Sequence, residues 1–178
     1  GTQRPRVMSV LSAGMHAPYE AYASDPYLSS PGSYSQKLAA DITSFYSDLW
    51  VDKAAELHPT VEFVHVSPGL VDTNWGTDMP SPVRWAIRVL QKLPLVAKSA
   101  SDCAELLLAG LVDYELAGGY ASATPSDTGA DDDAYYQFGR FYLLTEFAKP
   151  AKKTALHSTA AVDTVHADTW KLLEPLKK

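Results

Sequence analysis

A serine, a tyrosine and a lysine in the first quarter of the chain are the side chains best placed to do chemistry. Ser12 follows the nearly continuous apolar run 7–11, which is typical of a buried strand. Tyr34 and Lys37 stand three residues apart where a long amphipathic stretch begins, a spacing that puts both on one helix face. Because a phenol with a pKa near ~10 needs a nearby cation to exchange protons at neutral pH, this pair indicates acid-base chemistry.

A third segment, Pro68-Gly69 followed by Thr73, ends a second predicted strand. Residues 61–66 alternate in polarity, which predicts this strand, and the proline and glycine end it. Open α/β sheets place their ligands at the carboxyl ends of the strands. We therefore expect Ser12, the start of the helix and the Pro68-Gly69 segment to converge on one crevice.

The elements that must position these residues form a βαβ unit. Apolar residues at spacings of three to five predict an amphipathic helix over residues 33–58, which Pro59 ends. Strands at 7–11 and 61–66 flank this helix, and a right-handed crossover makes them parallel. The first strand is of the kind buried on both faces, yet only two or three strands are available. We therefore expect further strands to precede residue 1.

Turn residues and apolar spacing predict the remaining segments. Alternating strands and helices indicate an α/β fold, here a single domain spanning residues 1–178. The segments expected are a loop or lid at 15–32, helices at 82–93, 99–111, 134–148 and 158–173, a short strand at 118–122 and an acidic loop at 125–133.

Composition excludes several classes of protein. With 15 Lys and Arg against 21 Asp and Glu, the formal net charge is −6, which argues against nucleic acid as the main partner. The single cysteine, Cys103, excludes an internal disulfide and suits a reducing compartment, so we expect a cytoplasmic location. No apolar run is long enough for a membrane span. The five histidines show no pair at ligand spacing, so we expect no metal site.

In this order, the three segments resemble the second half of the short-chain dehydrogenase/reductase family. That half runs from a strand with a catalytic serine, through Tyr-x-x-x-Lys on a long helix, to a strand ending in Pro-Gly-x-x-x-Thr. The resemblance covers most of the chain, from Val7 to Tyr120, and the loop after Ser12 is similar in length to the retinol-dehydrogenase-like branch found in fungi. It implies the C-terminal half of a Rossmann-like doubly wound parallel sheet, about three strands with flanking helices, whose N-terminal dinucleotide-binding half is absent.

The resemblance also implies roles for the residues. Tyr34 would exchange the proton of a carbonyl or alcohol, Lys37 would lower the tyrosine's pKa and hold the nicotinamide ribose, and Ser12 would bind the substrate oxygen. The cofactor would be NAD(P), with NADP slightly favoured. The cofactor-binding residues implied are Lys37, Pro68, Gly69 and Thr73.

Two partners are expected with this function. Trp75, Trp85 and the apolar lid favour a small or lipophilic carbonyl or alcohol as substrate. Members of the family often dimerise through the long helix, and the wide apolar stripe of helix 33–58, with Tyr46 and Trp50, is consistent with a homodimer there.

The chain departs from the family pattern in two ways. Ser33 stands four residues before Lys37, where the family has its tyrosine, so the motif reads Ser-Tyr-Ser-Gln-Lys. No glycine-rich Gly-x-x-x-Gly-x-Gly turn is present, so we expect the chain to be inactive alone. An alternative is therefore a non-catalytic binding or interaction module derived from this fold. A serine hydrolase is disfavoured because the chain has no Gly-x-Ser-x-Gly elbow.

Overall fold

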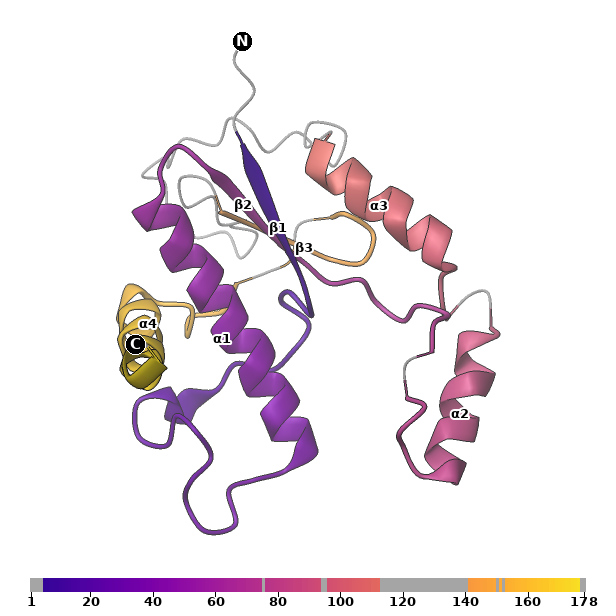
Figure 1. Ribbon diagram of the computed structural model, residues 1–178, viewed down its shortest axis with the longest axis horizontal. Coiled ribbons are helices and arrows are strands. Elements are labelled where there is room, and N and C mark those ends of the chain that lie inside the picture. Colours follow the sequence, from indigo (N-terminus) through magenta and orange to yellow (C-terminus); the bar gives the residue numbers. More distant parts are fainter. Residues whose placement is uncertain are drawn as a thin grey trace.

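The computed structural model in Figure 1 describes residues 5–74, 76–93, 96–112, 141–149, 151 and 153–176. Within this part, three strands form one parallel sheet flanked by helices, which confirms the α/β class and the parallel pairing of the first two strands. The strands, in sheet order, are β1 (Arg6–Val10), β2 (Glu62–Val66) and β3 (Phe141–Leu144). The helices are α1 (Gln36–Leu57), α2 (Ser81–Gln91), α3 (Ala100–Val112) and α4 (Thr159–Leu173), with 3-10 turns η1 (Glu20–Tyr22) and η2 (Glu174–Leu176).

Helix α1 connects β1 to β2. It begins after Ser35, whose hydroxyl accepts a hydrogen bond from the N–H of Leu38 at 3.1 Å and so caps the first turn. Its apolar residues Ile42, Phe45 and Leu49 are buried. The helix starts three residues later than the range 33–58 expected from periodicity, because the serine at position 35 takes an extended backbone.

The helices cover both faces of the sheet. On one face, Val51 of α1 packs in a cluster with Phe63 and the inward residues of β3. On the other, Leu107 of α3 packs against Val64 and its neighbours. Helix α4 lies against the outer side of α1, where Val165 joins the largest core cluster (Figure 1). The result is a layered arrangement of α3, sheet, α1 and α4.

Strand β1 is less buried than its sequence suggests. The apolar run predicts a strand covered on both faces, but Val7 is 48% exposed and Val10 is 47% exposed. The cause is its position: β1 is an edge strand that, in the described residues, pairs with β2 alone. Its apolar composition is typical of an interior strand, whereas among the described strands only one lies beside it.

Strand β3 replaces part of an expected helix. The aromatic residues of 134–148 lie at helical spacing, but residues 141–144 pair with β2 in parallel. Phe141, Leu143 and Leu144 are all buried, so this segment has apolar side chains buried on both sheet faces, although in the described residues it pairs with β2 alone. The expected strand at 118–122 and acidic loop at 125–133 lie outside the described residues.

The segment 15–32 is a loop with the short turn η1, packed onto α1 and α4. Tyr19 is buried in the core and its hydroxyl donates to the carbonyl oxygen of Asp25 at 2.8 Å. The Asp25 carboxylate accepts hydrogen bonds from Ser29 and Ser30. Burial alone would raise the pKa of Asp25, but these hydrogen bonds outweigh it and lower the pKa to about 2. The loop is therefore anchored by its own residues.

The other helices begin within one residue of their expected starts. The hydroxyls of Ser99 and Ser158 accept hydrogen bonds from the N–H of Asp102 and of Ala161, which is why α3 and α4 begin where they do. Among the described helices, none combines the length and apolar character that crossing a bilayer requires.

Candidate functional site

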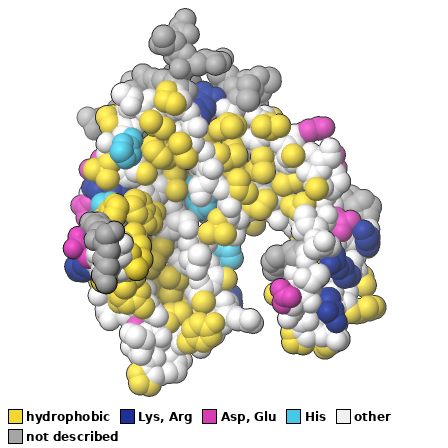
Figure 2. All heavy atoms as spheres, in the orientation of Figure 1, with side chains coloured by type: hydrophobic (Ala, Val, Ile, Leu, Met, Phe, Trp, Pro, Cys, Tyr) yellow, Lys and Arg dark blue, Asp and Glu magenta, His cyan; other side chains and the backbone are white. Residues whose placement is uncertain are grey.

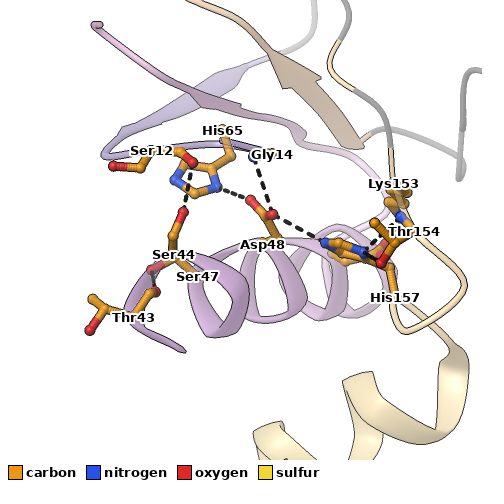
Figure 3. Close-up of polar contacts among 11 residues, drawn as sticks. Ser12, Gly14, Thr43, Ser44, Ser47, Asp48, His65, Lys153, Thr154 and His157 are labelled. Atoms are coloured by element: carbon orange, nitrogen blue, oxygen red, sulfur yellow. Dashed lines mark hydrogen bonds and ion pairs between the residues drawn. The ribbon is translucent and has the colours of Figure 1, made fainter. Parts of the chain in front are cut away.

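Ser12 lies directly beyond the carboxyl end of β1, and its backbone is tied to α1. The hydroxyl of Ser44 donates a 2.6 Å hydrogen bond to the carbonyl oxygen of Ser12, and the N–H of Met15 donates to the same oxygen at 3.0 Å. The Ser12 hydroxyl makes no hydrogen bond within the described part of the chain, and Figure 3 shows it pointing away from Ser44. The backbone of Ser12 is therefore fixed, and its hydroxyl is available to a ligand.

Lys37 is held by an aspartate rather than by the tyrosine. Its ammonium lies 2.6 Å from a carboxylate oxygen of Asp41, one helical turn further along α1. The other oxygen of Asp41 lies 3.0 Å from Nδ1 of His16. The hydrogen bond from Lys37 holds the pKa of Asp41 below its usual value, despite the opposing effect of burial.

Tyr34 stands outside the helix. It precedes the capping Ser35, so its ring does not share a helix face with Lys37 as the sequence spacing predicted. The side chain is 68% exposed, and its hydroxyl has no hydrogen-bond partner in the described residues. The structure therefore does not bring the tyrosine and the lysine together.

The Pro68-Gly69 turn lies at the same edge of the sheet, and the segment after β3 packs against it. Gly69 has a φ of +65°, in the left-handed region that favours glycine. A Cβ added to Gly69 would lie 2.8 Å from Cβ of Glu146, and Lys98 donates to the Glu146 carbonyl at 2.8 Å. The segment after β3 thus fills the space beside this turn.

Thr73 lies further out, on an exposed stretch that leads to α2. Its carbonyl oxygen accepts a hydrogen bond from Arg88 at 2.7 Å and one from Gln91 at 3.2 Å. The structure therefore spreads the expected site residues along the carboxyl edge: Ser12 and Pro68-Gly69 follow neighbouring strands, and Lys37 begins the helix between them.

A polar stripe along α1, which the sequence did not single out, ties the site together. Each member faces inward beside the apolar stripe, and each binds another segment of the chain. Its members, at spacings of three or four residues, are Asp41, Ser44, Asp48 and Asp52.

Asp48 is the centre of this stripe. It is 2% exposed, and its carboxylate lies 2.6 Å from Nδ1 of His65 on β2 and 3.2 Å from Nε2 of His157 (Figure 3). The N–H of Gly14 donates to it at 3.3 Å. One carboxylate therefore links the loop after β1, the central strand and the segment before α4.

The hydrogen-bond partners of the two histidines determine which ring nitrogen carries the proton. The backbone N–H of Thr154 donates to Nδ1 of His157 at 3.0 Å, so the ring proton of His157 is on Nε2 and points at Asp48. His65 likewise donates to Asp48 from Nδ1. Burial alone would raise the pKa of Asp48, but the hydrogen bonds from the two histidines outweigh it and lower the pKa.

Ser12, His65 and Asp48 have the residue types of a serine-hydrolase triad but not its geometry. The triad needs a hydrogen bond from the serine hydroxyl to the second ring nitrogen. Nε2 of His65 has no hydrogen-bond partner in the described residues, and the ring is fully buried. Because no substrate can reach that nitrogen, the Asp48–His65 pair is a structural anchor.

Asp52 makes a second buried link, to Lys153. The two side chains form an ion pair, and the Lys153 ammonium lies 4.8 Å from the centre of the Phe141 ring. Burial lowers the pKa of Lys153, partly offset by the neighbouring aspartate. This pair joins α1 to the segment that follows β3.

A sequence signal for the stripe does exist. Aspartates at 41, 48 and 52, with Ser44 between them, lie beside the core residues Phe45 and Leu49 on a helix with an apolar face. Polar residues so placed need buried partners. What the sequence could not supply is the identity of those partners, which come from segments far along the chain.

Comparison with known proteins gives no relative: no family model, no curated protein and no solved structure matches this chain.

The described residues do not fit NAD(P) on their own. Glu146 fills the space beside Gly69, and Lys37 is paired with Asp41. The chain also lacks a glycine-rich turn that would receive a pyrophosphate at a helix N-terminus. A dinucleotide site would need residues from another segment.

Proposed function

We propose that this chain is the substrate-side part of an NAD(P)-dependent oxidoreductase of the short-chain dehydrogenase/reductase type, acting on a carbonyl or alcohol. The observation that carries the proposal is Ser12. Its hydroxyl lies at the carboxyl end of a parallel strand, without a partner in the described residues, while Ser44 fixes its backbone. A hydroxyl at this edge on an anchored backbone suits a group that binds a substrate oxygen.

The roles of the other residues follow from their places. Two anchors on α1 hold the loop that carries Ser12: Ser44 binds the Ser12 carbonyl, and Asp48 binds the N–H of Gly14. Tyr34 is the proposed proton donor, the role that the resemblance implies, and its phenol is exposed. For Lys37 to assist it, the ion pair with Asp41 would have to open.

The proposal requires a partner for the sheet. Strand β1 has an interior composition and an open edge, so a strand of a dinucleotide-binding half would pair there and cover Val7 and Val10. The Rossmann-like identity of the whole sheet is part of this proposal. NADP is the cofactor proposed for the completed site.

The test is carbonyl reduction by the purified gene product at its native length, with NADPH and NADH. Ser12→Ala is expected to lower kcat/KM by about 10²- to 10³-fold, the cost of removing one hydrogen-bond donor from a reacting oxygen. Ser47→Ala is the matched control, since this serine also lies near the site on α1 but bonds only the Thr43 carbonyl. Equal activity of the two variants would refute the role of Ser12.

A non-catalytic module derived from the same fold is the second candidate. It is favoured by one observation, that Tyr34 stands off the helix while Lys37 is engaged by Asp41. This candidate predicts that the gene product binds NADPH, measured by fluorescence of the dinucleotide, yet reduces no carbonyl in a broad panel. Turnover that depends on Ser12 would exclude it.

A further inference from the structure

His16 is held at one ring nitrogen by a buried acid. Its Nδ1 lies 3.0 Å from a carboxylate oxygen of Asp41, which is 6% exposed, whereas the His16 side chain is 28% exposed. The hydrogen bonds from Lys37 and His16 hold the pKa of Asp41 below its usual value, so at neutral pH this carboxylate accepts and does not donate. The proton of a neutral His16 ring is therefore on Nδ1, and Nε2 has the lone pair.

The second ring nitrogen of His16 reaches solvent. Nε2 has no hydrogen-bond partner in the described residues. Within those residues, Nε2 of His65 is the single buried side-chain nitrogen or oxygen without a partner, so the unpaired Nε2 of His16 is not buried. A histidine with an acid on one nitrogen and a free second nitrogen has the arrangement of an acid-base catalyst.

The other four histidines, all in the described residues, lack this arrangement. The side chains of His65 and His157 are 0% and 5% exposed. Nε2 of His166 accepts a hydrogen bond from a tryptophan, and His58 has no acidic partner in the described part of the chain. His16 is therefore the histidine that is placed to exchange a proton with a bound molecule.

His16 lies close to Ser12. The N–H of Met15 donates to the Ser12 carbonyl at 3.0 Å, which closes a turn and keeps the α carbons of these two residues within about 7 Å. His16 follows this turn directly. Both ends of the turn are tied to α1, since Ser44 binds the Ser12 carbonyl and Asp41, one helical turn earlier, binds His16. In Figure 3 the Ser12 hydroxyl points toward the N-terminal end of the drawn helix, which is the end that carries Asp41.

The region beyond Ser12 has room for a substrate. Strand β1 ends beside α1 (Figure 1), and Figure 2 shows the surface hollowed between this part of the molecule and α2. A hydroxyl and an imidazole at one sheet edge supply the two groups that hold an oxygen and exchange a proton with it. Tyr34, in contrast, stands off the helix, and the cation expected beside it, Lys37, is paired with Asp41.

We propose that Nε2 of His16 exchanges the proton of the substrate oxygen that Ser12 binds, a role that the resemblance gives to Tyr34. This inference rests on the proposed function, which supplies the substrate and the hydride donor. In the direction of reduction, the N–H bond at Nε2 breaks, its electron pair stays on the nitrogen, and an O–H bond forms on the substrate. The carbonyl carbon receives the hydride of the reduced dinucleotide, which is thereby oxidised, and the carbonyl becomes an alcohol. The neutral ring then takes a proton from water.

The kinetic experiment uses the purified gene product at its native length, with NADPH and the carbonyl that the wild-type protein reduces fastest. His16→Asn is the test variant, because its amide N–H takes about the place of Nδ1 and keeps the bond to Asp41, while Nε2 is lost. We expect kcat to fall by about 10²- to 10³-fold with KM little changed, and added imidazole to restore part of the rate. His58→Asn is the matched control, the same change at an exposed histidine directly after α1, and it should leave kcat unchanged.

Access to the ring is measured without turnover. Diethyl pyrocarbonate modifies unprotonated ring nitrogens, and mass spectrometry locates the products. His16 should react at least about tenfold faster than the buried His65 and His157. If His16 reacts as slowly as those two, no substrate reaches Nε2, and the role of His16 is refuted whatever the activity of the protein.

Two kinetic results would also overturn the proposal. One is a His16→Asn variant that keeps the wild-type kcat. The other is a Tyr34→Phe variant that loses the rate while imidazole restores none of the rate of His16→Asn. A wild-type protein that reduces no carbonyl would refute the proposed function itself, and the role of His16 with it. That result is distinct from the other two, because it is seen before any variant is compared.

Discussion

Asp48→Asn should destabilise the protein far more than an equivalent change at its surface. An asparagine keeps the size of the side chain and one acceptor oxygen, which can still serve His65. Its amide group, however, is a donor, and it faces the N–H groups of His157 and Gly14. These two donors, one on the buried His157 side chain and one on the half-buried Gly14, are then left without their acceptor at a position that is 2% exposed.

The magnitude follows from these losses. A buried donor left unpaired costs about 1–3 kcal/mol, and the lower cost of burying a neutral amide offsets part of that. We expect the free energy of unfolding to fall by about 3 kcal/mol, which for a urea slope near ~2 kcal/mol/M moves the midpoint by about 1.5 M.

The control is Glu56→Gln, the same acid-to-amide change on the same helix. Glu56 is exposed and pairs only with Lys53, so its loss should cost no more than about 1 kcal/mol. Both variants are measured by urea unfolding followed by circular dichroism at neutral pH. A change for Asp48→Asn as small as that for Glu56→Gln would refute the assignment of Asp48 as the centre of the anchor.

The pH dependence of stability gives an independent check on the same residue. The pKa of Asp48 is lower in the folded protein than the value near ~3.9 of an unfolded chain, so the unfolded state takes up the proton first. Its contribution is therefore complete above about pH 5 and is lost as the pH falls through the folded pKa. The stability of Asp48→Asn should vary less over that acid range.

Three further outcomes test other parts of the structure. With a folded pKa of about 2, Asp25 should support stability above about pH 4 and lose that contribution toward pH 2, so Asp25→Asn should flatten acid unfolding there. Gly69→Ala should destabilise by more than Gly32→Ala, by about 1–3 kcal/mol in urea unfolding; both have positive φ, but only the first would clash with Glu146. Cys103 is buried, so its reaction with a thiol reagent should be at least about 100-fold slower in the folded protein than in urea.

The βαβ unit could be predicted because its signals are local. An apolar strand, regular apolar spacing along α1 and Pro59 are all read within a few turns of chain. The position of Ser12 at the end of β1 follows directly from that unit. The start of α1 was misplaced by three residues, since periodicity alone does not reveal which serine caps the helix.

Strand β3 could not be predicted because its formation depends on pairing. Its four residues lie among aromatics at helical spacing, and only the parallel contact with β2 makes an extended backbone favourable. The hydrogen bonds of Asp48 could not be predicted either. The sequence indicates which face of α1 carries Asp48, but its partners His65 and His157 are 17 and 109 residues away. A local sequence pattern does not identify partners that are distant in the sequence.

The apolar stripe of α1 has a partner within the chain. Trp50 packs edge-on against His166 at 4.9 Å and Trp170 at 6.0 Å, and the Tyr46 hydroxyl donates to the carbonyl of Pro26. Helix α4 and the loop before α1 thus account for the width of the stripe. Dimerisation through α1 stays a prediction, and it now needs a contact other than these aromatic residues.

The edge of β1 is where the sequence and the structure together say most about function. Val7 and Val10 are on opposite faces of the strand, and both are about half exposed although the strand has the composition of a sheet interior. One covering helix could protect only one of these faces, whereas a paired strand with its own helices would protect both and satisfy the open backbone groups. Because Ser12 follows directly from this strand, whatever pairs with β1 would end beside that hydroxyl. Under the proposed function, the segment that pairs with β1 and the segment that completes the site would therefore be the same.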